Sequence, residues 1–188
     1  MRKILLLFAL IGCSATLRAQ HLGIKNNVIA DALLSPNLAL EFGLGKQTTL
    51  ELYASYNPFE TNKERKFKHW LAQPELRYWP CERFNGYFLG LHAVVGEFNA
   101  AAWKLPGGLL SFLDDKRYEG LLYGAGVSLG HQWILGKRWN IEAAVGAGYT
   151  KIDYDRFNCE ECSPRINSDS YHYFGLTRTV VSIVYFLR

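Results

Sequence analysis

The chain has 188 residues, of which 14% are aromatic and 17 are glycine, and its formal net charge is +4 at pH 7. No stretch of about 18 apolar residues follows the N-terminal region, which excludes a membrane protein built from helices. Cleavage after residue 19 would remove three basic residues and no acidic one, leaving a net charge of +1, so we expect no nucleic-acid partner.

Residues 1–19 have the features of a secretory signal peptide. Arg2 and Lys3 form a basic start, an apolar stretch follows from Ile4 to Ile11, and Ala19 precedes the expected cleavage point at Gln20. We therefore expect cleavage of this signal, with residues 20–188 forming one exported domain. A second interpretation stays open, because the sequence LIGC that ends at Cys13 resembles a lipoprotein processing site. That processing would make Cys13 a lipidated N-terminus.

Eight segments alternate between two kinds of side chain, as strands with one polar and one apolar face do. The segment 69–79 is the clearest, since Gln73, Glu75 and Arg77 share one parity and Leu76 lies on the other. It is about eleven residues long, enough for a tilted strand to cross a bilayer. Polar-inward, apolar-outward alternation predicts an all-β fold, an eight-stranded antiparallel up-and-down transmembrane β-barrel. The expected strands are 22–34, 37–45, 48–57, 69–79, 87–96, 118–135, 139–154 and 171–187.

The connections between these segments alternate between short and long. Short turns join the second strand to the third, the fourth to the fifth and the sixth to the seventh. Long polar connections cover residues 58–68, 99–117 and 155–170. Outer-membrane barrels have short periplasmic turns and long outer loops, so the pattern predicts this orientation. The first outer loop, around Ser35, is short and fits less well.

Aromatic residues gather near both ends of the expected strands. Amphipathic aromatic side chains prefer the membrane–water boundary, so two rings of them favour a membrane barrel over a soluble one. Near the inner ends lie Tyr78, Trp79, Tyr87, Phe88, Trp133, Trp139, Tyr185 and Phe186, and near the outer ends Tyr56, Trp70, Phe98, Tyr118, Tyr149, Tyr154 and Tyr173.

Charged residues collect on the expected inward faces. Eight strands enclose an interior just wide enough for side chains to fill, and charges confined there must be paired and hydrogen-bonded. We expect a salt-bridged plug, with a narrow proton or ion path as the alternative. The expected interior network consists of Lys25, Glu41, Glu51, Glu75, Arg77, His92, Glu142 and Arg178.

The pair Cys159 and Cys162 lies in the last outer loop with C-x-x-C spacing. In an exported chain this spacing favours a local disulfide. A zinc site would need two further ligands, and His172 is the nearby imidazole. Free thiols are the third possibility. Cys81 belongs to a turn at the opposite end, so we expect no bridge from it to either residue.

A set of short motifs extends over the whole mature chain. The motifs are Ile24–Asn27, Asp31–Asn37, Glu41–Gly45, His69–Trp79, Phe84–Gly86, Arg117–Gly120, Trp139–Glu142, Ile152–Tyr154, Cys159–Cys162 and Tyr173–Gly175. They resemble those of the family catalogued as domain of unknown function 3575, which is found in envelope proteins of Gram-negative anaerobes. The resemblance implies an outer-membrane β-barrel without an established activity or catalytic residues.

An enzyme is the second hypothesis, because some small outer-membrane barrels deacylate or acylate lipid A with a serine and a histidine at the membrane edge. Here Ser170 and His172 share one parity at the outer boundary. Asp153 or Asp169 could orient the histidine, as a nucleophile activated by a base requires. A serine and a histidine two residues apart are nevertheless a frequent coincidence.

We therefore expect a non-enzymatic, monomeric outer-membrane barrel with a plugged interior. Its role would lie in envelope integrity or in surface interaction through the outer loops. The expected partners are outer-membrane lipids and a surface or envelope protein, and we expect neither a cofactor nor a metal site. A soluble or lipid-anchored lipocalin-like carrier of a small ligand is the third hypothesis.

Overall fold

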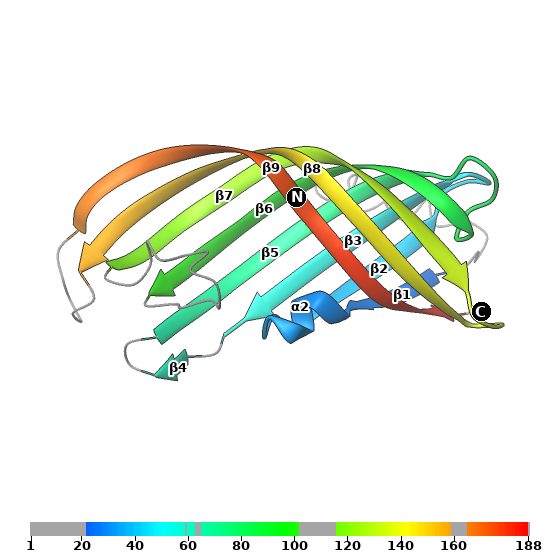
Figure 1. Ribbon diagram of the computed structural model, residues 1–188, viewed down its shortest axis with the longest axis horizontal. Coiled ribbons are helices and arrows are strands. Elements are labelled where there is room, and N and C mark those ends of the chain that lie inside the picture. The colour runs from blue at the N-terminus through cyan, green and yellow to red at the C-terminus, as the bar shows by residue number, and fades with distance from the viewer. Residues whose placement is uncertain (1–21, 59, 63–64, 102–115, 159–164, 188) are drawn as a thin grey trace, which may run out of the picture.

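The computed structural model describes residues 22–58, 60–62, 65–101, 116–158 and 165–187, which form one antiparallel sheet (Figure 1). The expected all-β fold with eight antiparallel strands is confirmed. A five-residue helix, α2 (Val28–Ala32), and a three-residue strand, β4 (Glu60–Asn62), are the additions to it. The long strands are β1 (Leu22–Asn27), β2 (Asn37–Gly43), β3 (Thr48–Asn57), β5 (Arg65–Tyr78), β6 (Gly86–Ala101), β7 (Lys116–Ile134), β8 (Trp139–Asn158) and β9 (Arg165–Leu187).

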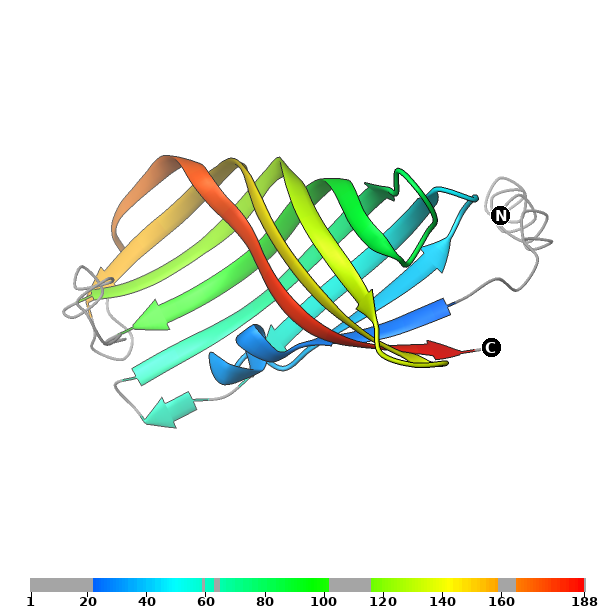
Figure 2. The same cartoon turned by 45° about the vertical axis from the view of Figure 1, so that its right-hand side comes forward.

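Each long strand pairs with two others. Strands next to each other in sequence pair antiparallel, with β3 pairing with β5 across the short β4. The first strand, β1, also pairs with the last, β9, over the six positions from Leu22 opposite Leu187 to Asn27 opposite Ser182. Followed from strand to strand, the pairings therefore lead from β1 around to β9 and back to β1. Figure 2 shows β1 beside the end of β9. None of the described helices is long and apolar enough to span a membrane.

The first expected strand, 22–34, is wrong beyond Asn27. The backbone of Asn27 is still extended, but its side-chain Oδ1 accepts a hydrogen bond of 3.2 Å from Ile29 N, which caps α2 at its start. An asparagine favours this cap because its carbonyl satisfies an amide that the first turn leaves without a partner. The segment then turns at Leu34, whose φ is +57°, and enters β2.

The strands extend further outward than expected, so the expected loops 99–117 and 155–170 are partly strand. The ladder between β6 and β7 continues to Ala101 opposite Arg117, and that between β8 and β9 to Phe157 opposite Arg165. Alternation of apolar and polar residues fades in these stretches, although backbone pairing does not require it. The strand lengths predicted from this alternation are therefore too short.

The two faces of the sheet have opposite character. Outward-facing apolar side chains are exposed, for example 45% at Leu52, 61% at Leu91 and 63% at Val127, whereas inward-facing Arg77 and Glu142 are 0% exposed. This distribution is the reverse of the usual one, in which large apolar side chains are buried and charged side chains are exposed. We call the outward-facing set the apolar belt; its members include Leu38, Leu52, Leu76, Leu89, Leu91, Val127, Leu129, Val145, Val181 and Ile183.

The two ends of the sheet differ. We call the end with the short β2–β3, β5–β6 and β7–β8 turns the inner end, and the opposite end the outer end. Strand length increases around the sheet, from six residues in β1 to 23 in β9, so β7, β8 and β9 project furthest at the outer end (Figure 1). On these projecting parts polar residues appear among the outward-facing ones, as at Lys151 on β8 and His172 on β9.

Candidate functional site

The eight residues of the expected interior network all point into the sheet interior. They come from seven strands, β1, β2, β3, β5, β6, β8 and β9, because an inward position recurs every second residue along each strand. Seven of them form one connected set of ion pairs, and His92 lies at its outer margin. The buried network therefore ties together strands that are distant along the chain.

Arg77 lies at the centre of the network. Its Nη1 and Nη2 donate hydrogen bonds to the two oxygens of Glu142 at 2.9 and 3.0 Å, and its Nε donates to Glu75 Oε1 at 3.0 Å. Its Nη2 also lies 2.7 Å from Glu51 Oε2, and its Nη1 3.3 Å from Glu41 Oε2. One guanidinium therefore contacts all four buried glutamates, which its planar fork of donors permits.

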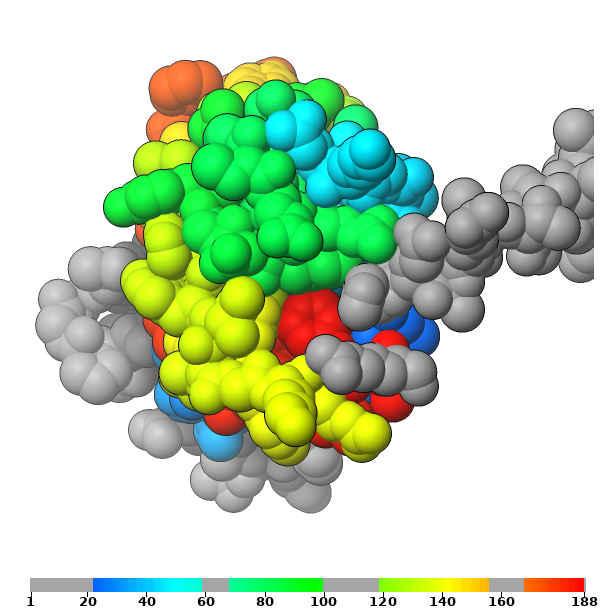
Figure 3. All heavy atoms as spheres, turned by 90° about the vertical axis from the view of Figure 1, so that its right-hand side faces the viewer, coloured from blue at the N-terminus to red at the C-terminus, as the bar shows by residue number. Residues whose placement is uncertain are grey.

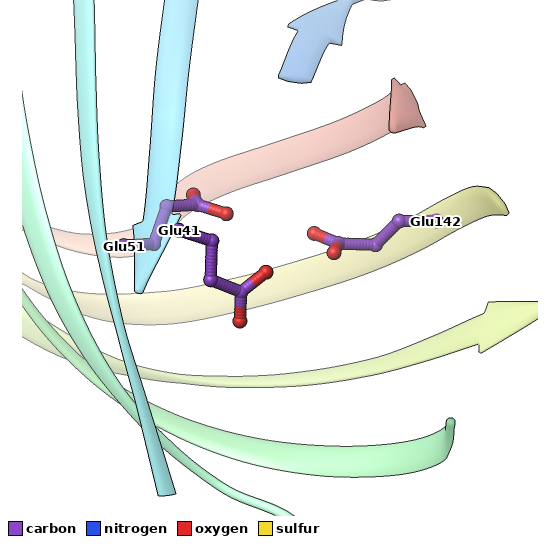
Figure 4. Close-up of side chains that lie close together, drawn as sticks. All are labelled: Glu41, Glu51 and Glu142. Carbon is purple, nitrogen blue, oxygen red and sulfur yellow. The ribbon is translucent and has the colours of Figure 1, made fainter. Parts of the chain in front are cut away.

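Lys25 occupies the space between three of these carboxylates. Glu41, Glu51 and Glu142 lie with their oxygens within 4.8 Å of one another (Figure 4). Oxygen ligands at such spacing could bind a divalent cation. The Lys25 ammonium instead contacts Glu41 and Glu142 directly and lies 2.9 Å from Glu51 Oε2. The positive charge that these carboxylates need is thus supplied by the chain itself.

Arg178 extends the network outward. Its guanidinium contacts Glu51, lies 2.8 Å from Glu75 Oε2 through Nε, and donates a 2.8 Å hydrogen bond from Nη1 to Gln73 Oε1. Gln73 was not expected as a member of the network, although it shares the parity of Glu75 and Arg77. A neutral side chain gives no charge signal, so only this parity could have found it.

His92 and Thr177 form the outer margin of the network. His92 Nε2 lies 2.9 Å from Thr177 Oγ1, and Ser128 donates a 2.9 Å hydrogen bond to Glu75 Oε1 from the neighbouring β7. Thr177 is an extra residue in β9, since Arg178 lies opposite Gly146 and Leu176 opposite Ala147. This β-bulge lets Thr177 reach inward where regular alternation would turn it outward. The pattern of residue types around Thr177 does not indicate this bulge.

Aromatic side chains fill the interior at the inner end. The ring centroids of Trp79 and Phe88 lie 4.8 Å apart, those of Phe84 and Phe186 5.0 Å, and the Arg77 guanidinium lies 4.3 Å from the Phe88 centroid. The expectation that Trp79, Phe88 and Phe186 belong to the ring of membrane-boundary aromatics near the inner ends is therefore wrong. Their inward parity places them in the core, and Figure 3 shows the short turns gathered over this end.

The interior opens toward the outer end. A cavity of about 710 Å³ lies between the outer parts of β3, β5, β6, β7, β8 and β9. Aromatic Tyr56, Phe98 and Tyr154 line it together with polar Asn57 and Glu119. Its size falls in the range of about 300–1,000 Å³ that is usual for small-molecule pockets.

The residues of the enzyme hypothesis lie near one another on β8 and β9, but their described hydrogen bonds do not link the serine to the histidine. Ser170 lies opposite Asp153 in the β8–β9 ladder, and its backbone N–H donates to Asp169 Oδ1 at 2.8 Å. The His172 imidazole contacts the Tyr149 hydroxyl through Nδ1, and within the described residues it forms no hydrogen bond with Ser170. The arrangement lacks the serine–histidine contact through which a base activates a nucleophile.

The expected disulfide between Cys159 and Cys162 lies outside the described residues. Cys81 is described, in the turn between β5 and β6, where its thiol is free and exposed. The expected signal peptide, residues 1–19, and Cys13 also lie outside the described part of the chain.

Comparison with known proteins gives one match. The model of a family described as "Protein of unknown function (DUF3575)" matches residues 5–187. No curated protein and no solved structure matches the chain.

Proposed function

We propose a function from the geometry of this chain, which belongs to the DUF3575 family, a family whose description assigns no activity. The protein is a non-enzymatic transmembrane β-barrel of the outer membrane of a Gram-negative cell envelope. Its interior is sealed by the ionic network and the inner aromatic cluster. It contributes to envelope integrity or binds a surface or envelope protein through its outer end.

The apolar belt is the observation that carries this proposal. On β6 the outward-facing residues Leu89, Leu91 and Val95 are exposed, and Glu97 follows at the outer end. Tyr87 on β6, Trp133 on β7 and other exposed aromatics bound the belt at the inner end. A strand of about ten residues crosses a bilayer, and a closed sheet leaves no unpaired edge within it. Hydrocarbon is the surrounding in which such an outer face is stable.

Export and orientation follow from the same proposal. Residues 1–19 direct export and are removed, the short turns lie in the periplasm, and the projecting ends of β7, β8 and β9 lie outside the cell. In this oxidising location Cys159 and Cys162 form a local disulfide. The protein acts as a monomer, since its outward-facing residues are covered by lipid.

A sealed interior distinguishes this proposal from a pore. Charges taken out of water must be paired, and here one guanidinium contacts four carboxylates while aromatic rings fill the space below it. A solute would have to break several buried ion pairs to pass. We therefore expect no steady ion conductance.

The test combines fractionation, gel electrophoresis with and without boiling, and recording in planar bilayers. We expect the protein in the outer-membrane fraction, a band that shifts on boiling, and no steady conductance. Recovery in the soluble periplasmic fraction without a shift would overturn insertion and favour a lipocalin-like carrier. A steady conductance in an inserted, heat-modifiable protein would overturn only the sealed interior.

A separate measurement addresses catalysis. Envelope lipids of cells that produce the parent protein and the Ser170→Ala variant are compared by mass spectrometry. We expect identical lipid profiles. A lipid change that appears with the parent and disappears with Ser170→Ala would overturn the non-enzymatic assignment and favour a lipid-modifying enzyme.

A further inference from the structure

The outer part of β9 has a free edge. Its ladder with β1 ends where Asn27 lies opposite Ser182, whereas its ladder with β8 continues outward through Ser168. Among the described residues, no strand pairs with the β1-facing edge of β9 beyond Ser182. Figure 1 shows this part of β9, in orange, rising away from β1 and α2.

Side chains cap the lowest part of this edge. Asn27 Oδ1 accepts from Val181 N at 3.2 Å, and Asn27 Nδ2 donates to Thr179 O at 3.1 Å. Gln73 Nε2 donates to Thr177 O at 3.4 Å. The Asn27 amide thus takes the place that the next peptide unit of β1 would occupy, and the edge needs no strand up to the bulge.

Beyond the bulge the caps are incomplete. Tyr173 donates from its hydroxyl to Leu176 O at 3.5 Å, and the Asp169 carboxylate accepts from Ser170 N at 2.8 Å. Below the bulge, the outward-facing residue Val181 directs its backbone N–H toward the β1-facing edge. Along a strand, residues on the same face direct their N–H and C=O groups to the same side, so the outward-facing residues above the bulge also direct theirs to this edge. His172 and Phe174 therefore present their N–H and C=O groups there, with no partner in the described chain.

Exposed aromatic side chains accompany these backbone groups. Phe174 is 82% exposed, Tyr171 56% and Tyr173 36%. Proteins usually protect a solvent-exposed edge strand with lysine, proline or a bulge. Residues 168–176 contain neither lysine nor proline, and the bulge lies at the inner limit of the stretch. Aromatic residues are enriched where proteins bind each other.

We propose that this edge, residues 170–176 of β9, binds an extended peptide segment of a partner protein by adding it to the sheet as an antiparallel strand. Main-chain hydrogen bonds to His172 and Phe174 supply the affinity, and Tyr171 and Tyr173 contact alternate side chains of the segment. The added strand lies along the edge of β9 that faces β1 further inward, beyond the part of this edge that α2 contacts. The inference rests on the proposed function, which places this edge in water at the outer surface.

Two other occupants fit the edge less well. A second copy in the same membrane has its β9 running in the same direction, so a two-fold pair cannot form the antiparallel ladder. Lipid chains offer no donors or acceptors to the free backbone groups, whose exposure to hydrocarbon would be costly.

The test uses the full chain refolded into lipid nanodiscs and a fluorescent peptide of alternating valine and threonine as the probe, followed by fluorescence anisotropy. The variant Phe174→Pro removes the backbone N–H at the free edge and leaves the donors to β8 in place. The variant Phe174→Ala removes the aromatic ring but keeps this N–H. We expect saturable binding by the parent and by Phe174→Ala, and binding roughly tenfold weaker or worse by Phe174→Pro, the loss of one or two hydrogen bonds.

A control probe carries N-methyl groups on alternate amides and cannot form the ladder, so it should not bind. Absence of valine–threonine binding to an inserted parent protein, or equal binding by Phe174→Pro, would overturn strand addition. Loss of binding in Phe174→Ala as well would overturn it in favour of a side-chain contact. The shift on boiling, recorded on the same samples, separates a failure of this inference from a failure of membrane insertion.

Discussion

The guanidinium of Arg77 binds the carboxylate of Glu142 through two parallel hydrogen bonds, 2.9 Å from Nη1 to Oε2 and 3.0 Å from Nη2 to Oε1. Both side chains are fully buried. They join β5 to β8, strands that do not pair with each other in the sheet. The contact thus braces the interior across its width, in addition to the backbone ladders around it.

This brace predicts a large effect of replacing Arg77. In Arg77→Met four carboxylates lose a shared partner, and the free energy of unfolding should fall by about 3–5 kcal/mol. Arg77→Lys keeps the charge but not the fork and should recover only part of the loss. Urea titration of the refolded protein, followed by the gel shift, measures both. Lys137→Met, in the exposed β7–β8 turn, is the control and should unfold like the parent.

The apolar belt predicts that a charge is tolerated outside it but not within it. If the sheet is inserted in a membrane as proposed, Leu91→Arg places a guanidinium among lipid chains and should lower the free energy of unfolding in bilayers by about 2–4 kcal/mol. Ser170→Arg, on the projecting part of β9, should change it little. Similar stabilities for the two variants would mean that Leu91 faces water, which would contradict membrane insertion.

Removal of the cap at Asn27 should destabilise the nearby edge of β9. Asn27→Ala removes the acceptor of Ile29 N and leaves Val181 N and Thr179 O without partners, which should cost about 1–3 kcal/mol. Hydrogen exchange of the Val181 amide should accelerate. Asn26→Ala, which removes a single hydrogen bond to Asn37 O, is the matched control. An unchanged Val181 exchange rate in Asn27→Ala would show that the cap does not close this edge.

The close contacts around Gly90 indicate that the network is tightly packed, so an added methyl group there should be destabilising. A Cβ atom there would lie 2.2 Å from Glu75 Oε1 and 2.3 Å from Ser128 Oγ, so Gly90→Ala must displace both groups. The free energy of unfolding should fall by about 1–3 kcal/mol, as it does when a packed interior is overfilled. Gly136→Ala is the control, because a Cβ at Gly136 meets nothing within 4 Å. Equal stability of the two variants would argue against a tightly packed plug.

Much of the fold could be predicted from the sequence because the side-chain period of a strand is two. That period identified the strands and placed the charged residues Glu75 and Arg77 on one face. It could not identify Gln73 or Ser128 as network members, since neutral polar residues gain their role from the charges that the register brings near them. Partners such as Arg77 and Glu142 are separated along the chain by 65 residues and meet only once the sheet forms.

Two further features arise where a side-chain cap or a bulge interrupts the regular strand, which the period of two does not indicate. Asn27 ends β1 because its side chain can cap either a helix or a strand edge, and here it does both. Thr177 turns inward through a bulge that leaves no mark in the pattern of residue types. Trp79 and Phe88 were assigned to an aromatic ring from their height along the strands, although their parity already pointed inward.

The short ladder between β1 and β9, which we call the seam, closes the sheet and affects how the molecule folds. Only six residue pairs close the sheet, and they join the first described strand to the last. The hairpins between β5 and β9 are local and can form early, whereas this seam brings together segments separated by most of the chain and carries the largest loop-closure entropy. We therefore expect closure to occur late in folding. Until it occurs, the edges of β1 and of the inner part of β9 would remain open to any factor that guides assembly.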